Sequence, residues 1–369
     1  MKILIDCRHL FRNHLPEEYC LYLMGVLAAL KMEKPQVEFY FLADKFPMVK
    51  IPAGTTAENI IQVKSLPSSE IWSERQLSTS IKKIKPDILI MTGGIAADNA
   101  KTVQLVWIPA ARNINKKNKY SNRIAKKIPE TIGHASVIFT DSELYKKKLL
   151  DQYPFSHDKI IVIPPAVNEN CCKIPWEEKE HTKKKYTKGK EYFFIRAKNF
   201  SDPDLIDLLK AFSQFKKKQH SNMQCIITGE KENKEFLKKM ESFKYRDDVS
   251  VFAGLTEIEL RKICGAAYAY VQVTEDANDL LCAFGMCIPV VCNKSEYLEE
   301  IAGEAALYAQ FTEPESTAHH LISIYKNENL RNELIQRGVM RATQLSIQSQ
   351  QIELWKAIEF ALDNKNKQL

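Results

Sequence analysis

The sequence is poor in glycine, with 12 glycines among 369 residues, about half of the ~7% that is usual in proteins. Glycine lets a phosphate group come close to the backbone, so its scarcity counts against a phosphate-cradling loop. The sequence also lacks an apolar run of the about 18 residues that a membrane-spanning helix needs. Hydrophobic residues make up 45% and charged residues 27%, a balance that predicts a soluble globular protein.

The amino-terminal segment lacks the apolar stretch of a signal peptide. Only Ile3, Leu4 and Ile5 follow one another before Asp6, whereas a signal peptide needs about 7–15 apolar residues there. We therefore expect Lys2–Asp6 to form a first β-strand and the protein to remain in the cytoplasm.

The nine cysteines contain no C-x-x-C pair. Cys282, Cys287 and Cys292 recur at intervals of five, which suits neither a zinc site nor a redox motif. This pattern predicts reduced, mostly buried thiols and no metal site.

The formal net charge is +7, and the lysines are spread over segments such as 116–127, 146–148 and 183–190. Solvated helix faces explain most of this charge. An anionic membrane surface or an acidic partner protein is the second interpretation, and it would place the protein at the inner face of the membrane. Binding of nucleic acid is not predicted, because no helix-turn-helix, zinc-finger or RNP-type pattern occurs.

Short apolar runs alternate with helical patterns along most of the chain, which is long enough for two domains. Runs such as Ile88-Leu89-Ile90 are typical of strands buried on both faces, and therefore of parallel sheets covered by helices. The alternation predicts two doubly wound α/β domains. We expect a first domain at 1–168, a linker at 169–190, a second domain at 191–347 and a last helix within 348–369.

A series of segments follows in the second half of the chain: Tyr192-Phe193-Phe194-Ile195, Cys225-Ile226-Ile227-Thr228-Gly229, Val249-Ser250-Val251-Phe252-Ala253-Gly254-Leu255, Ile288-Pro289-Val290-Val291 and Glu299-Glu300-Ile301-Ala302-Gly303-Glu304-Ala305-Ala306-Leu307-Tyr308. In their order and spacing, these segments resemble glycosyltransferase family 4, the glycosyl transferases of group 1. The resemblance implies the GT-B fold, in which two Rossmann-like domains face a cleft. It also implies an acceptor-side first domain, a nucleotide-sugar-side second domain and a last helix that returns to the first.

The donor implied by this resemblance is a UDP-, GDP- or ADP-linked sugar, and the acceptor is a glycan. The family stabilises the departing diphosphate with an arginine and a lysine and places two glutamates eight positions apart around a Gly-Phe-Gly turn. Here the glutamate positions fall on Thr274 and Cys282, and the arginine and lysine positions fall on Asp202 and Pro203. A carboxylate about 4 Å from a phosphate charge costs roughly 4 kcal/mol at an effective dielectric constant near 20. The sequence therefore predicts an impaired donor site.

Four residues at strand ends remain as candidates for nucleotide binding. Gly93 and Gly94 follow a predicted strand and could accept a phosphate there, although a plain turn is the simpler interpretation. Arg196 and Lys198 flank another strand end and could replace the lost cations. The alternative is that Arg196 packs or pairs locally and that Lys198 is a solvated loop residue.

Glu299 and Glu300 match a family position near the nucleotide ribose, and a role on the helix surface is an equal alternative. Two functions are compatible with these features. One is a retaining, sugar-nucleotide-dependent transferase of polysaccharide or glycoconjugate synthesis with an impaired donor site. The other is a non-catalytic GT-B subunit that binds or scaffolds an active transferase. The charge around Arg196 and the neighbouring carboxylates is expected to distinguish them.

Overall fold

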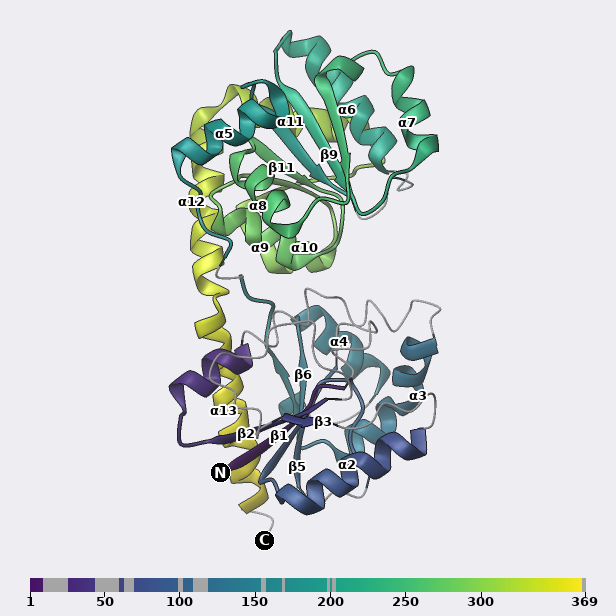
Figure 1. Cartoon of the computed structure of the whole chain (residues 1–369), viewed down its shortest axis with the longest axis vertical. Coiled ribbons are helices and arrows are strands. Elements are labelled where there is room, and N and C mark those ends of the chain that lie inside the picture. Colours follow the sequence, from purple (N-terminus) through teal and green to yellow (C-terminus); the bar gives the residue numbers. More distant parts are fainter. Residues whose placement is uncertain are drawn as a thin grey trace. The chain divides into compact units, whose positions relative to one another are not determined.

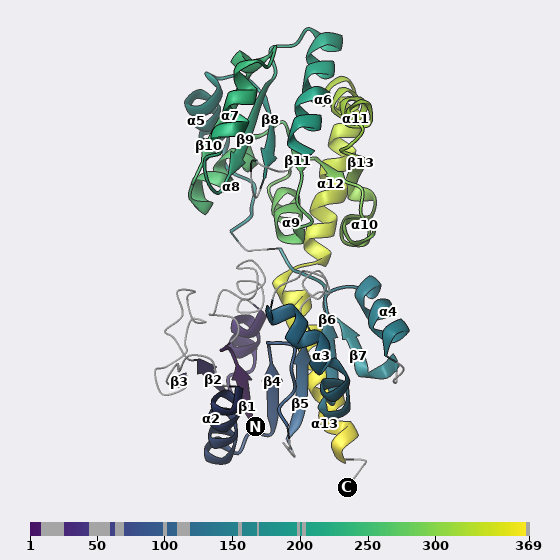
Figure 2. The same cartoon turned by 90° about the vertical axis from the view of Figure 1, so that its right-hand side faces the viewer.

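The chain divides into two compact units, which Figures 1 and 2 show from two sides. Unit 1 comprises Met1–Ala166 with Ile347–Leu369, and unit 2 comprises Val167–Ser346. The computed structural model describes residues 1–8, 26–43, 60–62, 70–98, 102–108, 119–153, 157–167, 170–197, 200 and 204–366. Each unit is built on one parallel sheet.

Within its described residues, unit 1 contains a seven-stranded sheet in the order β3-β2-β1-β4-β5-β6-β7. Its strands are β1 (Lys2–Asp6), β2 (Glu38–Ala43), β3 (Ile60–Gln62), β4 (Ile88–Met91), β5 (Val103–Trp107), β6 (Val137–Thr140) and β7 (Ile160–Val162). Every residue of β4, β5 and β6 is buried. The prediction of a parallel sheet covered on both faces is therefore confirmed.

Helices cover both faces of this sheet. Residues 26–33 are helical, and the other helices are α2 (Glu70–Ile84), α3 (Lys119–His134), α4 (Glu143–Gln152) and α13 (Ile347–Asn366). One core cluster joins Leu27 and Leu354 to one face of the sheet. A second joins Leu77, Ile128 and Leu149 to the other. The last helix thus packs in unit 1, as the GT-B resemblance implied.

The described part of unit 2 contains a six-stranded parallel sheet in the order β10-β9-β8-β11-β12-β13. Its strands are β8 (Tyr192–Arg196), β9 (Gln224–Gly229), β10 (Val249–Ala253), β11 (Ala269–Gln272), β12 (Val290–Asn293) and β13 (Ala306–Ala309). Its helices are α5 (Trp176–Thr187), α6 (Asp204–Gln219), α7 (Lys234–Glu241), α8 (Glu257–Ala266), α9 (Ala277–Gly285), α10 (Glu296–Ala302), α11 (Pro314–Lys326) and α12 (Glu328–Gln344). In Figure 2, α5 and α8 lie on one side of the sheet and α6 and α11 on the other.

The start of α8 follows the capping-box spacing in the sequence. Thr256 Oγ1 accepts a hydrogen bond from the Glu259 backbone N–H at 3.3 Å, and Glu259 Oε2 accepts one from the Thr256 N–H at 3.2 Å. These two bonds satisfy two amide groups that the first helical turn would leave without partners.

The stretch predicted as a linker, 169–190, contains helix α5, which packs on α8 within unit 2. The sequence shows no apolar period here because charge pairs hold this helix. Lys183, almost fully buried, lies 3.1 Å from Glu180 and 2.6 Å from Glu191. Lys262 of α8 reaches Glu178 at 2.7 Å. A helix fixed by ion pairs carries no stripe that hydrophobic periodicity could detect.

None of the helices in the described part of the chain combines the length and the apolarity that crossing a membrane requires.

A buried lysine fixes the entry into β9. The Lys216 ammonium donates hydrogen bonds to the carbonyls of Ser221 at 2.5 Å and Met223 at 3.0 Å, and it lies 2.9 Å from Asp248 Oδ2. Its side chain is 7% exposed. A charge at this depth is stable only because all of its donors have acceptors.

We therefore expect Lys216→Met to lower the free energy of unfolding by about 2 kcal/mol, because two carbonyls and a carboxylate lose their donor. Urea denaturation followed by circular dichroism measures this loss. Lys217→Met, at an exposed neighbouring position of the same helix, is the matched control and should change stability little. Equal effects of the two substitutions would contradict this role of Lys216.

Candidate functional site

Polar side chains form one row across unit 2 at the carboxyl ends of its strands. The strand register places Thr228, Arg196, Gln272, Cys292 and Tyr308 side by side on β9, β8, β11, β12 and β13. Residues in register point to the same face of a sheet. We call these five residues the polar row. Ligands of open α/β sheets bind beyond the carboxyl ends of the strands, so the polar row borders the candidate site.

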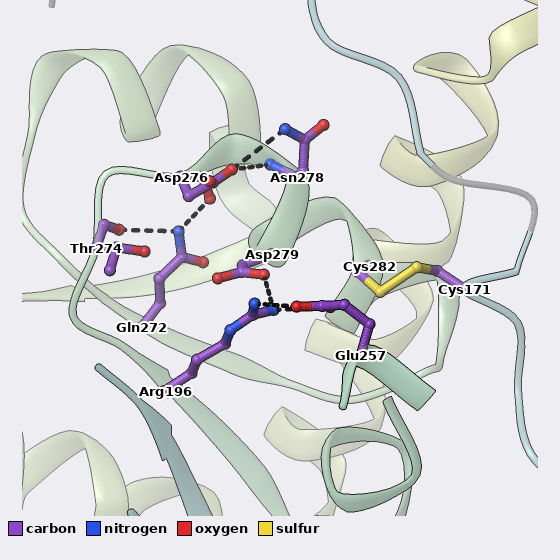
Figure 3. A network of polar contacts seen from close by, with 9 residues as sticks. All are labelled: Cys171, Arg196, Glu257, Gln272, Thr274, Asp276, Asn278, Asp279 and Cys282. Atoms are coloured by element: carbon purple, nitrogen blue, oxygen red, sulfur yellow. Dashed lines mark hydrogen bonds and ion pairs between the residues drawn. A yellow bond between two sulfur atoms is a disulfide. The ribbon is translucent and has the colours of Figure 1, made fainter. Parts of the chain in front are cut away.

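Arg196 is the cation of the polar row, and two carboxylates pair with it (Figure 3). Its guanidinium lies 2.7 Å from Asp279 Oδ1, in the first turn of α9, and 2.7 Å from Glu257 Oε1, in the first turn of α8. The Arg196 and Asp279 side chains are 24% and 14% exposed, whereas Glu257 is 60% exposed. The pair with Asp279 is therefore the better shielded from solvent.

These carboxylates also set the protonation of the guanidinium. Burial alone would lower the pKa of Arg196, but the negative charges of Asp279 and Glu257 outweigh burial and raise that pKa above its ordinary value. Arg196 is thus permanently charged. That charge is compensated inside the protein before any ligand arrives.

The loop between β11 and α9 closes the start of the helix. Asp276 Oδ1 accepts a hydrogen bond from the Asn278 backbone N–H at 2.8 Å and caps α9. The Gln272 amide donates to the carbonyls of Thr274 at 3.0 Å and Asp276 at 2.5 Å, as Figure 3 shows. A helix start attracts anions, and here a carboxylate of the chain itself already occupies it.

Cys282, at the second glutamate position, forms a disulfide with Cys171 (Figure 3). The prediction of reduced thiols is therefore wrong for these two residues. They are 111 positions apart in the sequence, and only the fold brings their Cα atoms to 4.9 Å, so no local spacing could indicate the bond. Six other described cysteines are thiols, and four of these are buried, as predicted.

Helix α9 is packed closely on two sides. A Cβ atom added at Gly285 would lie 2.2 Å from the Cys171 carbonyl oxygen, so backbone touches backbone there. On α12, a Cβ atom added at Gly338 would lie 2.8 Å from a ring carbon of Phe284. The disulfide and these two contacts fix the helix that carries Asp276 and Asp279.

Comparison with known families decides the nature of this unit. Residues 177–340 match the model of a family described as "Glycosyl transferases group 1". The match lies within unit 2 and spans most of it. Unit 2 is a domain of this family. We call it the group 1 unit below. No curated protein matches the chain.

Solved structures resemble both units. A glycosyltransferase from Rickettsia africae is 14% identical, with a TM-score of 0.71 over 98% of this chain and 99% of that one. Anabaena Alr3699/HepE, solved in complex with UDP and glucose, is 10% identical, with a TM-score of 0.69 over 97% and 99%. WaaG, a glycosyltransferase of lipopolysaccharide biosynthesis, is 11% identical, with a TM-score of 0.63 over 96% and 98%. At these identities the likeness establishes the fold, which is GT-B.

Two further candidates lie on α10 of the group 1 unit. Glu299 and Glu300 are half-buried. Burial, and after it the charge of Glu299, raises the pKa of the Cys292 thiol to about 12. Burial also raises the pKa of Tyr308, followed by the effects of Cys292 and then of Glu299. Glu299 therefore lies beside the polar row. The Glu300 backbone carbonyl accepts a hydrogen bond from Arg341 of α12 at 2.9 Å.

Gly93 and Gly94 belong to unit 1, where they follow β4 and are both buried. Gly94 has a φ of 75°, which a side chain would disfavour. Two backbone amides after this turn have side-chain acceptors: Ala96 donates to Thr131 Oγ1 at 3.2 Å, and Ala97 donates to Gln104 Oε1 at 2.8 Å. Side chains of unit 1 thus already bind these two amides after the turn.

Lys198, Asp202 and Pro203 lie outside the described residues. The pairing of Arg196 with Glu257 and Asp279 is what the sequence did not reveal, because 61 and 83 positions separate the partners. Within the described residues, no group of histidine, cysteine, aspartate and glutamate side chains could hold a metal ion.

The close contact at Gly285 generates a test of the packing of α9. We expect Gly285→Ala to lower the free energy of unfolding by about 2 kcal/mol or more, because the added methyl group meets a backbone carbonyl that must move. Thermal unfolding monitored by circular dichroism measures the change. Gly133→Ala is the control, since nothing lies within 4 Å of the added atom on helix α3, and alanine favours a helix by up to about 1 kcal/mol over glycine. A stable Gly285→Ala variant would contradict the described packing.

Proposed function

We propose that this chain is a glycosyl transferase homologue with an impaired donor site, which acts as a non-catalytic binding or scaffold subunit beside an active transferase. The observation that carries the proposal is that Arg196 already forms ion pairs with Glu257 and Asp279. The related transferases, by the resemblance of the sequence, are retaining enzymes of polysaccharide or glycoconjugate synthesis.

Charge at the two helix starts supports this proposal. The described carboxylates at these two starts are those of Glu257 and Glu259 on α8 and of Asp276 and Asp279 on α9. Arg196 pairs with Glu257 and Asp279, and Lys185 pairs with Glu259. Four negative charges against two positive charges leave a net charge of −2. Transfer from a sugar nucleotide requires positive charge or free donors where the diphosphate departs. At this edge of the sheet a diphosphate would instead be repelled, by roughly 4 kcal/mol for each unpaired carboxylate near 4 Å.

Residues at the motif positions point the same way. Thr274 offers a hydroxyl group where the family has its first glutamate, and the sulfur of Cys282 is consumed in the disulfide. Neither can act as a carboxylate acid, base or ribose ligand. The group 1 unit therefore keeps the fold of a transferase without the charged groups that its chemistry uses.

A UDP-sugar-dependent transferase is the second candidate function. The structure of Anabaena HepE in complex with UDP and glucose favours it, since that protein shares the fold over nearly the whole chain. On this alternative the donor would be a UDP-sugar in preference to GDP- or ADP-linked sugars, and a glycan acceptor would bind on the side of unit 1. Glu299, beside the polar row, would then contact the ribose.

Calorimetric titration with UDP, GDP, ADP and their sugar conjugates separates the two candidates. We expect no nucleotide to bind with a Kd below about 1 mM, which corresponds to −4.1 kcal/mol. In the double variant Glu257→Gln/Asp279→Asn the guanidinium loses both counter-charges, and affinity for UDP should rise at least about tenfold, or 1.4 kcal/mol.

The control is Glu235→Gln/Glu241→Gln, which removes two exposed carboxylates from α7 and should leave affinity unchanged. Binding of UDP to the wild-type protein with a Kd below about 100 μM would overturn the proposed loss of the donor site and favour the transferase. If affinity for UDP does not rise in the double variant, the ion pairs of Arg196 are not what prevents nucleotide binding.

The partner of the subunit is proposed from the basic face of α4. Lys147 and Lys148 are exposed there, and an anionic membrane surface or an acidic protein would pair with them in the cytoplasm. We expect the protein to sediment with vesicles that contain anionic lipid and to be released at about 0.5 M salt. At this salt concentration, attraction between exposed charges extends over less than ~10 Å. Vesicles of neutral lipid are the control. Sedimentation that is independent of salt would exclude this electrostatic contact.

A further inference from the structure

One partner of the disulfide between Cys171 and Cys282 is partly exposed to solvent. Cys171 is buried, but Cys282 is half-buried, and the free Cys172 beside the bond is exposed. Two buried thiols of the same unit are shielded: burial raises the pKa of Cys264 and Cys292 to about 12, so they stay protonated and unreactive near neutral pH. Cys287, which follows α9, is half-buried. Among these cysteines, thiol chemistry is therefore favoured at the disulfide, at Cys172 and at Cys287.

The disulfide is attached to α9, the helix that also carries Asp279, the ion-pair partner of Arg196. Cys282 follows Asp279 by three residues, so both side chains lie on one face of α9. Figure 3 shows the disulfide and the Arg196 ion pairs around this helix. Apart from the disulfide, segment 170–172 meets α9 through the backbone contact at Gly285. Any shift of α9 along its axis changes the position of the Asp279 carboxylate relative to Arg196.

We propose that the Cys171–Cys282 disulfide is a reducible clamp, which holds α9 in the position where Asp279 forms its ion pair with Arg196. Reduction by a dithiol opens the clamp. A thiolate of the dithiol attacks Cys282 Sγ, and Cys171 leaves as a thiolate and takes up a proton. The second thiol of the reagent then attacks the mixed disulfide and releases Cys282. Two electrons pass to the protein, which gains two thiols, and the reagent leaves as a cyclic disulfide.

The clamp differs from a disulfide that only adds stability to the whole unit. A bond that closes a long loop raises the stability of the entire fold by restricting the unfolded chain. The clamp predicts in addition a local change, confined to α9 and the segment that it contacts. Its consequence at the donor site rests on the proposed function, whereas its effect on α9 does not.

Amide hydrogen exchange, read by mass spectrometry in the folded protein, tests the clamp. We expect dithiothreitol to speed exchange in residues 280–286 by at least about tenfold, as local opening becomes easier. Exchange in α11 should stay unchanged, since that helix packs on α6 on the opposite side of the sheet. The variant Cys171→Ala/Cys282→Ala should exchange rapidly with or without the reagent, and Cys172→Ser should behave like the wild type.

Two outcomes would overturn the clamp. One is the same exchange rate of α9 before and after reduction, with complete reduction verified by alkylation of all nine cysteines. The other is alkylation of all nine in denatured protein that has met no reductant, which would mean that the disulfide does not form. Wild-type reduction needs no substitution, so the test holds even where the double variant fails to fold.

Titration with UDP in both redox states separates the clamp from the proposed function. If reduction speeds exchange in α9 and UDP affinity rises, the clamp controls the donor site. If exchange speeds up and UDP still fails to bind, the clamp stands and its link to the donor site is refuted. Unchanged exchange refutes the clamp whatever the titration gives.

Discussion

A guanidinium at the end of a buried strand needs compensation, and this need organises the carboxyl edge of unit 2. Arg196 ends β8 and is largely covered by protein, so it requires carboxylates within hydrogen-bond distance. Glu257 and Asp279 supply them from the first turns of α8 and α9. Helix starts favour acidic side chains in any case, so each carboxylate serves its own helix and the arginine together. The cost of burying one cation is thus met by residues that the helices already prefer.

The core under one face of the sheet in the group 1 unit is separate from the polar row. One face of the sheet, with Phe193, Ile195 and Ile227, packs against α6 and α11. The core on this face contains no residue of the polar row. The polar row lies on the opposite face and at the strand ends. Buried residues such as Phe194 and Tyr270 precede the polar row on that same face, so the core packs along the strands and the polar row lies at their carboxyl ends.

Much of this arrangement could be predicted from the sequence. Alternating apolar runs indicated both parallel sheets, and the spacing of Thr256 and Glu259 indicated the start of α8, since these signals are local. Helix α5 was not predicted, because ion pairs such as Lys183 with Glu191 stand in place of an apolar stripe. The disulfide and the partners of Arg196 escaped because they join residues far apart in the chain. Sequence patterns report local periodicity, whereas a site is assembled from strand ends that only the sheet order brings together.

The position of α9 connects these observations. Its start is capped by Asp276, its first turn holds Arg196 through Asp279, and its later turns are fixed by Cys282 and by the close approach at Gly285. A helix start can bind an anion through its amide groups. Here the carboxylates of Asp276 and Asp279 lie at that place, and covalent and steric contacts hold the helix that carries them. A cap, an ion pair, a disulfide and a backbone contact thus act together on one short helix of unit 2.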